Sequence, residues 1–186
     1  MRDHNEQKRA FPMGFITGLL KFVAGLIVLI AVIVAITLTA ARFADGPWAV
    51  ITGGPFTTGT PSGVPDAIEL TDRQEVEFQL VESGTSRTTW IMQANGRLFI
   101  PSGYMNSLVG AIWKHWPYDA EQDGRIILRV DDKLYNMTMQ RIMQDPDLNQ
   151  VLSEIARKYG TGFGSEVPED QVTSGDLWIF ELIPRS

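Results

Sequence analysis

The hydrophobic pattern begins with a long apolar run without a charged residue, FVAGLIVLIAVIVAITLTA, over residues 22–40. As a helix with a rise of about 1.5 Å per residue, this run measures about 29 Å, close to the thickness of the hydrocarbon core of a bilayer. Residues 11–20 are also largely apolar, so the helix can begin earlier. We therefore predict one transmembrane helix that contacts the lipid bilayer through residues 22–40.

A cleaved signal peptide is the alternative interpretation of the same run. Thr39, Ala40 and Ala41 are small enough to form a cleavage site at its end. The apolar run is longer than the usual apolar region of a signal peptide, which favours a retained anchor.

The charge distribution gives the predicted span an orientation. Residues 1–21 hold four basic and two acidic side chains, a net charge of +2, and the whole chain carries −6, so the remainder carries −8. Basic residues concentrate on the cytoplasmic side of a span. We expect residues 1–21 in the cytoplasm and the rest as a periplasmic or other extracytoplasmic domain on a cytoplasmic (inner) membrane. An acidic domain repels phosphate backbones, which argues against nucleic acid as a partner.

From residue 75 onward, apolar and polar residues alternate with the period of half-buried strands. Val76, Phe78 and Leu80 form one apolar face, and Asn95-Gly96 is a strong hairpin signal because both residues tolerate positive φ. Tight hairpins join antiparallel strands. The six predicted strands span residues 76–81, 88–93, 97–100, 125–130, 133–142 and 177–183.

Two stretches have a helical period instead. In residues 104–116 apolar residues recur at every fourth position, and Pro117 ends the pattern. Residues 145–159 carry an apolar stripe between Pro146, which suits a first turn, and Gly160, which suits a helix end. Six strands and two helices predict an α+β domain built as a small barrel or a strongly curved sheet with the helices outside.

Residues 41–74 join the span to this domain and are rich in Gly, Pro, Thr and Ser. That composition is typical of a flexible linker, but Trp48, Val50 and Phe56 are too apolar for a solvated tether. We expect this collar to pack against the domain or the membrane surface. The predicted organisation is an N-terminal segment over residues 1–21, a span over 22–40, the collar over 41–74 and the folded domain over 75–186.

The amino-acid composition excludes several kinds of catalytic and metal-binding site. The chain has no cysteine, which excludes disulfides, thiolate metal sites and cysteine nucleophiles. Of its two histidines, His4 precedes the span and only His115 belongs to the domain. A zinc or non-haem iron site of the usual kind is therefore not expected.

Two segments carry the candidate chemistry. Lys114-His115-Trp116 places a cation, a base and an aromatic ring together, either as a pocket that holds an anion and moves a proton, or as an ordinary helix end. Residues 102–107 could bind a phosphate through backbone N–H groups at a helix start, or could be a strand-to-helix turn with a polar cap. Both alternatives remain open at the level of sequence.

Four motifs in order resemble the flavin-binding split β-barrel superfamily. They are WIMQANGRLFIPSG, DGRIILRVDDKLY, DPD followed by a short helix, and the terminal FELIPR. Within that superfamily, which includes pyridoxamine-phosphate-oxidase-like proteins, the sequence is most similar to the deazaflavin-dependent nitroreductase-like group. The resemblance implies a six-stranded antiparallel split β-barrel with two helices, often dimeric, that binds FMN or the deazaflavin F420.

The resemblance also implies where a cofactor phosphate binds. Relatives hold it with polar and basic side chains at the end of the third strand and in the following segment. The matching positions are Ser102, Gly103, Asn106, Ser107 and Lys114, with Arg87 as a further candidate. Lys114 is the one lysine or arginine between Gly103 and Arg125.

Two functions of different class follow. The first is an accessory or interaction subunit of a membrane assembly, with Trp48, Phe56 and Trp116 as contact residues for a membrane-protein partner or a second copy. The second is a flavin- or deazaflavin-dependent oxidoreductase or nitroreductase, in which the ring of FMN or F420 supplies the redox chemistry. An extracytoplasmic domain is harder to supply with a cytoplasmic cofactor, which favours the first.

Overall fold

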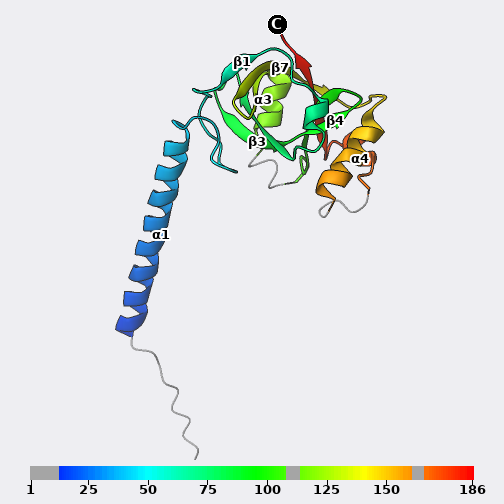
Figure 1. The fold of residues 1–186 in the computed structure, drawn as a ribbon. Coiled ribbons are helices and arrows are strands. Elements are labelled where there is room, and N and C mark those ends of the chain that lie inside the picture. Colours follow the sequence, from blue (N-terminus) through cyan, green and yellow to red (C-terminus); the bar gives the residue numbers. More distant parts are fainter. Residues whose placement is uncertain (1–12, 108–113, 161–165) are drawn as a thin grey trace, which may run out of the picture. The chain divides into compact units, whose positions relative to one another are not determined.

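The computed structural model describes residues 13–107, 114–160 and 166–186. The chain divides into two compact units, residues 1–40 and residues 41–186, which we describe separately (Figure 1). The basic side chains of residues 1–12, on which the predicted orientation rests, lie outside the described residues.

The first unit is dominated by helix α1, Met13–Ala41, which has 29 residues. At about 1.5 Å per residue this is a helix of about 43 Å. The hydroxyls of Thr37 and Thr39 donate to the carbonyls of Ile33 and Ala35, so neither polar group needs water. Over Gly14–Ala41 the helix is long and apolar enough to cross a membrane. The helix thus begins well before residue 22, as the apolar character of the preceding residues allows.

The second unit is built on one curled sheet whose neighbouring strands are antiparallel, except for a parallel pairing of β1 with β7. The strand order is β3-β2-β6-β7-β8-β5-β4. The described residues form eight strands, so the expected number of six is wrong. The strands are β1 Thr60–Ser62, β2 Glu75–Leu80, β3 Ser86–Trp90, β4 Met92–Ala94, β5 Arg97–Ser102, β6 Arg125–Val130, β7 Lys133–Ile142 and β8 Trp178–Pro184.

The two ends of this strand order, β3 and β4, are consecutive in the chain and are separated only by Ile91. Residues 88–93 were expected to form one strand, but the first part pairs with β2 and the second part with β5. Ile91 is fully buried at the break. The two edge strands, β3 and β4, are therefore joined covalently through Ile91, at the point where the backbone hydrogen-bond ladder is interrupted.

The helices differ more from the sequence pattern than the strands do. In the stretch expected to be helical, Tyr104–Ser107 is a turn, and residues 108–113 lie outside the described part of the chain. Helix α3, Trp116–Gln122, begins where the predicted helix was to end, with Pro117 in its first turn. Proline has no N–H to donate, and the first turn is where a helix needs none. The prediction that Pro117 ends a helix is therefore wrong.

Two further α-helices complete the unit. Helix α4, Leu148–Tyr159, confirms the second predicted helix, and Leu148, Val151, Leu152 and Ile155 form its buried stripe. Helix α5, Asp170–Thr173, is a short helix in addition to the two that the sequence pattern predicted. With α1 and α3 this makes four α-helices among the described residues, and a short 3-10 helix, η1, covers Ile68–Leu70.

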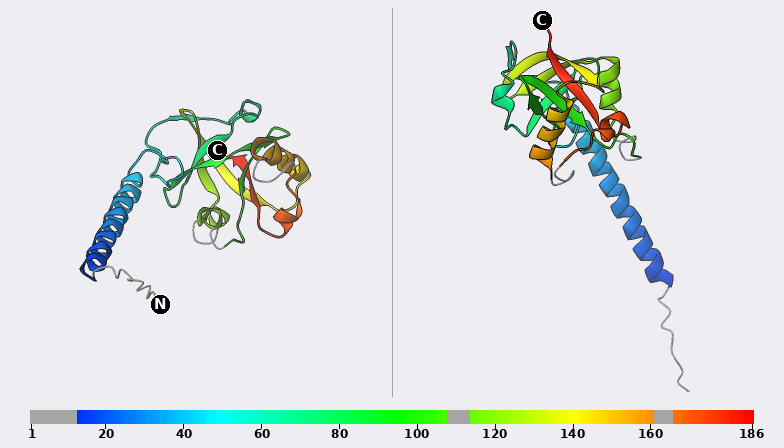
Figure 2. Two further views of the ribbon diagram at one scale, coloured as in Figure 1. Left: turned by 90° about the horizontal axis from the view of Figure 1, so that it is seen from below. Right: turned by 90° about the vertical axis from the view of Figure 1, so that its right-hand side faces the viewer.

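Two hydrophobic cores hold the unit together. The inside of the curl is filled by Phe78, Phe180, Leu128 and neighbouring apolar side chains, and α3 contributes Trp116 and Ala120 to it. The second core lies between α4 and the outer side of β4, β5 and β8. In Figure 1 α3 is seen over the open centre of the curl, in Figure 2 it lies at one end of the curl, and α4 packs on the outside in each view. The first three residues of β8, 178–180, are all buried, so this part of the strand is covered on both faces.

The collar, residues 41–74, packs on the curled sheet, which confirms one of its two expected locations. Gly53 forms a backbone bridge with Ser86 of β3, and the backbone N–H of Phe56 donates to the side chain of Gln79 over 2.7 Å. The strand β1 extends the sheet along the first residues of β7. The apolar residues of the collar therefore belong to a folded segment rather than to a solvated tether.

Candidate functional site

A cavity of about 460 Å³ lies beside the interrupted part of the sheet. Its walls come from β3, the end of β5 and the turn that follows, the start of α3, Ala49 and Val50 of the collar, and single residues of β2 and α4 and Leu177. This volume lies within the usual range of small-molecule sites. The cavity brings together four of the expected site residues, Ser102, Gly103, Lys114 and Trp116.

The polar residues of the cavity wall are Glu75, Thr88, Thr89, Ser102 and Lys114, together with the backbone of Gly103. The Ser102 hydroxyl donates to the sulfur of Met105 over 3.3 Å. The Lys114 ammonium donates to the carbonyl oxygen of Gly103 over 2.7 Å and lies 5.8 Å from the centre of the Tyr104 ring. Burial lowers the pKa of the Lys114 ammonium below 10.5, and the charge of Asp176 acts in the opposite direction. Lys114 is the one basic side chain among the described residues that line the cavity.

The other walls are aromatic. Trp90, at the end of β3, stacks on Tyr159 of α4 with ring centres 3.9 Å apart and planes 5° apart. Trp116 meets Phe78 edge-on at 5.1 Å. Trp90, Tyr104 and Trp116 all line the cavity. Such rings offer flat apolar surfaces to a ligand.

Two residues of the cavity wall have an unusual backbone conformation. Tyr104 has φ of 60° and Ala49 has φ of 50°. Side chains other than glycine and asparagine seldom adopt positive φ, and such strain is concentrated at functional sites. Asn95 and Asp131, which also have positive φ among the described residues, sit in tight hairpin turns of the sheet, where this conformation is ordinary. Ala49 likewise lies in a tight turn, between the bridged residues Trp48 and Ile51, so its positive φ has the same local origin.

The remaining expected phosphate contacts lie elsewhere. Asn106 is exposed, and its side chain donates to the carbonyl of Ser174 over 3.1 Å. The Ser107 hydroxyl donates to the carbonyl of Tyr104 over 2.8 Å, within one turn. Arg87 is part of β3 but does not line the cavity. Burial lowers the pKa of Arg87, and Asp119 partly offsets that effect.

The three expected contact residues do not share one environment. Trp116 is 7% exposed and belongs to the interior core, so the expectation that it is exposed is wrong. Phe56 lies under the guanidinium of Arg129, at 4.1 Å from the ring centre. Trp48 alone is well exposed, at 47%. His115, the candidate base, is exposed just before α3 and does not line the cavity.

Among the described residues, no group of three or more His, Asp or Glu side chains is placed to hold a metal ion.

The sequence pattern did not indicate that Trp90 stacks on Tyr159 beside the cavity. Each residue fits the apolar face of its own strand or helix, but the stacking depends on how α4 packs against the end of β3. No local pattern predicts that contact.

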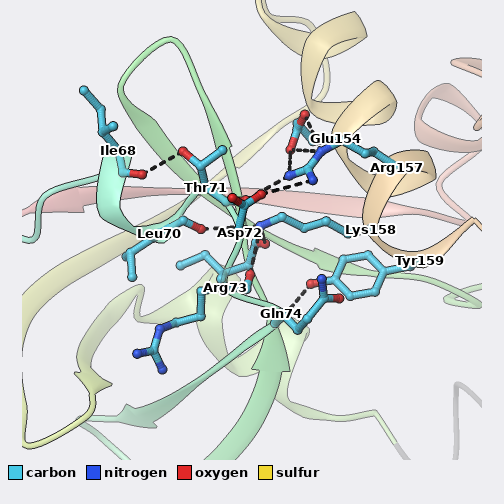
Figure 3. Close-up of polar contacts among 11 residues, drawn as sticks. Ile68, Leu70, Thr71, Asp72, Arg73, Gln74, Glu154, Arg157, Lys158 and Tyr159 are labelled. Atoms are coloured by element: carbon cyan, nitrogen blue, oxygen red, sulfur yellow. Dashed lines mark hydrogen bonds and ion pairs between the residues drawn. The ribbon is translucent and has the colours of Figure 1, made fainter.

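The C-terminal end of α4, where Tyr159 stacks on Trp90 of the cavity wall, is hydrogen-bonded to the collar (Figure 3). The Lys158 ammonium donates to the carbonyls of Arg73 and Ile91 over 2.8 and 2.9 Å, and to that of Leu70 over 3.4 Å. The Tyr159 hydroxyl donates to the carbonyl of Gln74. Burial raises the pKa of the Tyr159 phenol to about 12. Lys158 therefore satisfies the carbonyl at the break between β3 and β4.

Replacing Lys158 by methionine is expected to lower the free energy of unfolding by about 1–2 kcal/mol, because partly buried carbonyls lose their donor. Arg157→Met is the matched control: its side chain is 45% exposed and pairs with Asp72 and Glu154 at the surface. Such surface pairs contribute about 0–1 kcal/mol. Urea unfolding of the full chain in mild detergent measures both, and an equal loss in the two variants would contradict this role of Lys158.

No family model and no curated protein matches the sequence. Two solved structures are similar to it at 12% identity. One is a candidate pyridoxamine 5'-phosphate oxidase from Listeria innocua, with a TM-score of 0.43 over 64% of this chain and 89% of that chain. The other is a conserved hypothetical protein from Mycobacterium tuberculosis, with a TM-score of 0.41 over 70% and 87%. Both are distant, so the functional argument rests on the residues of the cavity.

Proposed function

We propose that the curled-sheet unit binds a flat aromatic ligand with an anionic group, of the flavin or deazaflavin class, in the cavity beside β3 and β5. The observation that carries the proposal is the arrangement of the cavity, in which Lys114 and Ser102 face a space walled by Trp90, Tyr104 and Trp116. A cation on one side and flat rings on the others match a ligand with one charged end and one flat apolar end.

Each part of such a cofactor can be matched to particular residues of the cavity wall. Lys114 would hold the phosphate of FMN or the acidic tail of F420, and Ser102 would donate to it. The rings of Trp90 and Tyr104 would flank the flat part and exclude water. A flavin or deazaflavin ring supplies electron or hydride transfer when it is bound, so an oxidoreductase or nitroreductase is the reaction class that follows.

An accessory role in a membrane assembly is the second candidate. It was based on Trp48, Phe56 and Trp116 as one contact surface. Trp116 is buried and Phe56 is covered by Arg129, so this surface is reduced to Trp48. We therefore place ligand binding first.

The ligand proposal is tested by purifying the full chain in mild detergent and incubating it separately with FMN and F420. After gel filtration, one of the two is expected to remain bound at about one molecule per chain, with its visible absorption band. Protein that elutes colourless after both incubations would refute the proposal.

We further propose that α1 spans a cytoplasmic membrane with residues 1–12 inside and the curled-sheet unit outside. The length and apolar character of Gly14–Ala41 and the basic N-terminal residues support this. A reporter enzyme that is active only outside the cytoplasm, fused after Ser186, is expected to be active. Activity of a cytoplasm-specific reporter at the same position would overturn the orientation.

A further inference from the structure

The collar begins with a loop, residues 42–54, that is closed at its base. The carbonyl of Ala41 accepts hydrogen bonds from the N–H groups of Ala44 and Gly54, each over 3.1 Å. Gly53 exchanges two backbone hydrogen bonds with Ser86 of β3, of 3.0 and 3.2 Å. The hydroxyl of Ser86 also donates to the carbonyl of Gly54 over 2.6 Å. The loop is therefore fixed to the sheet at the residue where α1 ends.

The two sides of this loop are packed against each other. A Cβ atom on Gly53 would lie 1.8 Å from the carbonyl oxygen of Gly46, so no larger residue fits there. Near the tip, Trp48 and Ile51 form a backbone bridge with hydrogen bonds of 3.1 and 2.8 Å. The loop thus has a defined shape rather than that of a free tether.

The acidic side chain of the loop is engaged with the rest of the unit. Asp45 accepts from the N–H of Thr57 over 2.6 Å and from Arg129 over 3.1 Å, and the Thr58 hydroxyl donates to it as well. Burial alone would raise the pKa of Asp45, but these hydrogen bonds, chiefly from Thr58, and the charge of Arg129 lower it to about 2. Asp45 is the one carboxylate in residues 42–54, so the loop presents no unpaired negative charge.

The side chains at the outside of the loop are apolar. Phe43 is 86% exposed and Val50 is 88% exposed, with Trp48 between them in sequence at 47%. Exposed large apolar side chains that are grouped in one segment mark an interaction surface. Arg42, which is also exposed, adds a positive charge next to Phe43.

We propose that this loop is a second membrane contact, in which Phe43, Trp48 and Val50 enter the interfacial layer of an anionic phospholipid bilayer. The proposal rests on the membrane anchoring by α1. Phe43 follows the last residue of α1 by two positions, a chain length of at most about 7 Å, so it stays close to the end of the membrane helix. Aromatic residues favour this layer, and Arg42 suits anionic headgroups. Because the loop directly follows the membrane helix in the chain, a lipid surface is the partner that we expect it to contact.

The chain contains no cysteine, so single cysteines can carry a spin label without a background. The full chain, reconstituted in nanodiscs of phosphatidylcholine and phosphatidylglycerol, is labelled at Phe43→Cys or Val50→Cys. Met143→Cys, which replaces an exposed apolar residue far along the chain, is the control. Ile27→Cys, near the middle of α1, reports on the anchor itself. Accessibility to oxygen and to a water-soluble nickel complex gives the depth of each label.

The labels at residues 43 and 50 are expected to be several-fold less accessible to nickel than the label at residue 143, and more accessible to oxygen. Nickel accessibility equal to the control, with residue 27 protected, would overturn the loop contact and leave the anchor intact. A label at residue 27 open to nickel would overturn the anchoring and the loop contact together. Spin–spin broadening at residue 50 that disappears on dilution with unlabelled chain would assign the loop to a second copy instead.

Discussion

Replacement of Trp116 by alanine is expected to lower the free energy of unfolding by about 3–5 kcal/mol, the usual cost of removing a large buried ring. Trp116 is 7% exposed and packs against Phe78 and Phe180 in the interior core, with ring centres 5.1 and 5.6 Å away. Urea unfolding of the full chain in mild detergent, followed by fluorescence, measures the change. A contact residue for a partner would show a far smaller loss, so this variant separates the two roles of Trp116.

Tyr118→Ala on the same helix is the matched control. The Tyr118 ring meets Trp178 edge-on at 4.9 Å but is 41% exposed. We expect it to cost no more than about 1.5 kcal/mol, the upper value for one aromatic pair. A Trp116 variant as stable as the Tyr118 variant would contradict the interior placement of Trp116.

Replacement of Arg97 by methionine is expected to cost about 2–3 kcal/mol at neutral pH, because several partly buried, charge-assisted hydrogen bonds are lost together. The Arg97 guanidinium pairs with Asp145 and Asp147 before α4, both at 2.8 Å, and with Glu181 of β8 at 2.6 Å. These contacts raise the pKa of Arg97. Methionine retains much of the side-chain volume, so the variant tests the charge.

This loss depends on pH in a definite direction. Hydrogen bonds from Arg97 are the main reason that the pKa values of Asp145 and Asp147 fall below 3.8. A carboxyl whose pKa is lower in the folded chain stabilises the fold above its unfolded pKa, and this contribution is lost as the pH falls through the lowered value. The difference between the parent chain and Arg97→Met is therefore expected to shrink below about pH 4.

Arg125→Met is the control for this variant, because Arg125 also pairs with a carboxylate, Asp123, but its side chain is 53% exposed. We expect a much smaller loss of stability from this solvent-exposed pair than from Arg97→Met. If the Arg97 difference stayed constant between pH 7 and about pH 3, packing rather than charge would account for it.

Local signals predicted the strands and one helix well. The alternation around Phe78 gave β2, Asn95-Gly96 gave the hairpin between β4 and β5, and the apolar stripe of residues 145–159 gave α4. Each of these patterns reports which face of a single element is buried. Burial of one face is decided by residues two to four positions apart, which a sequence displays directly.

The errors concern contacts between distant segments. Nothing in the local pattern shows that the chain changes partner at Ile91, because residues on both sides of it favour strands equally. The sequence pattern around Trp116 is the same whether its ring contacts a partner or packs in the interior core. The cavity depends on the meeting of β3, β5 and α4. Ser102, Gly103 and Lys114, expected as phosphate contacts, line it, whereas the sequence pattern did not indicate Trp90 or its stacking on Tyr159.

The most direct test of the account is the affinity of the full chain for FMN and for F420, measured by equilibrium dialysis in mild detergent for the parent, Lys114→Ala and Lys133→Ala. Lys133 is an exposed lysine at the start of β7 and does not line the cavity, so its loss changes net charge equally. Loss of one charge-assisted contact is worth about 1.5–3 kcal/mol, or about 10- to 150-fold in affinity. We expect that loss in Lys114→Ala, with Lys133→Ala unchanged, for the ligand that binds. Equal affinities in all three chains would contradict ligand binding in this cavity.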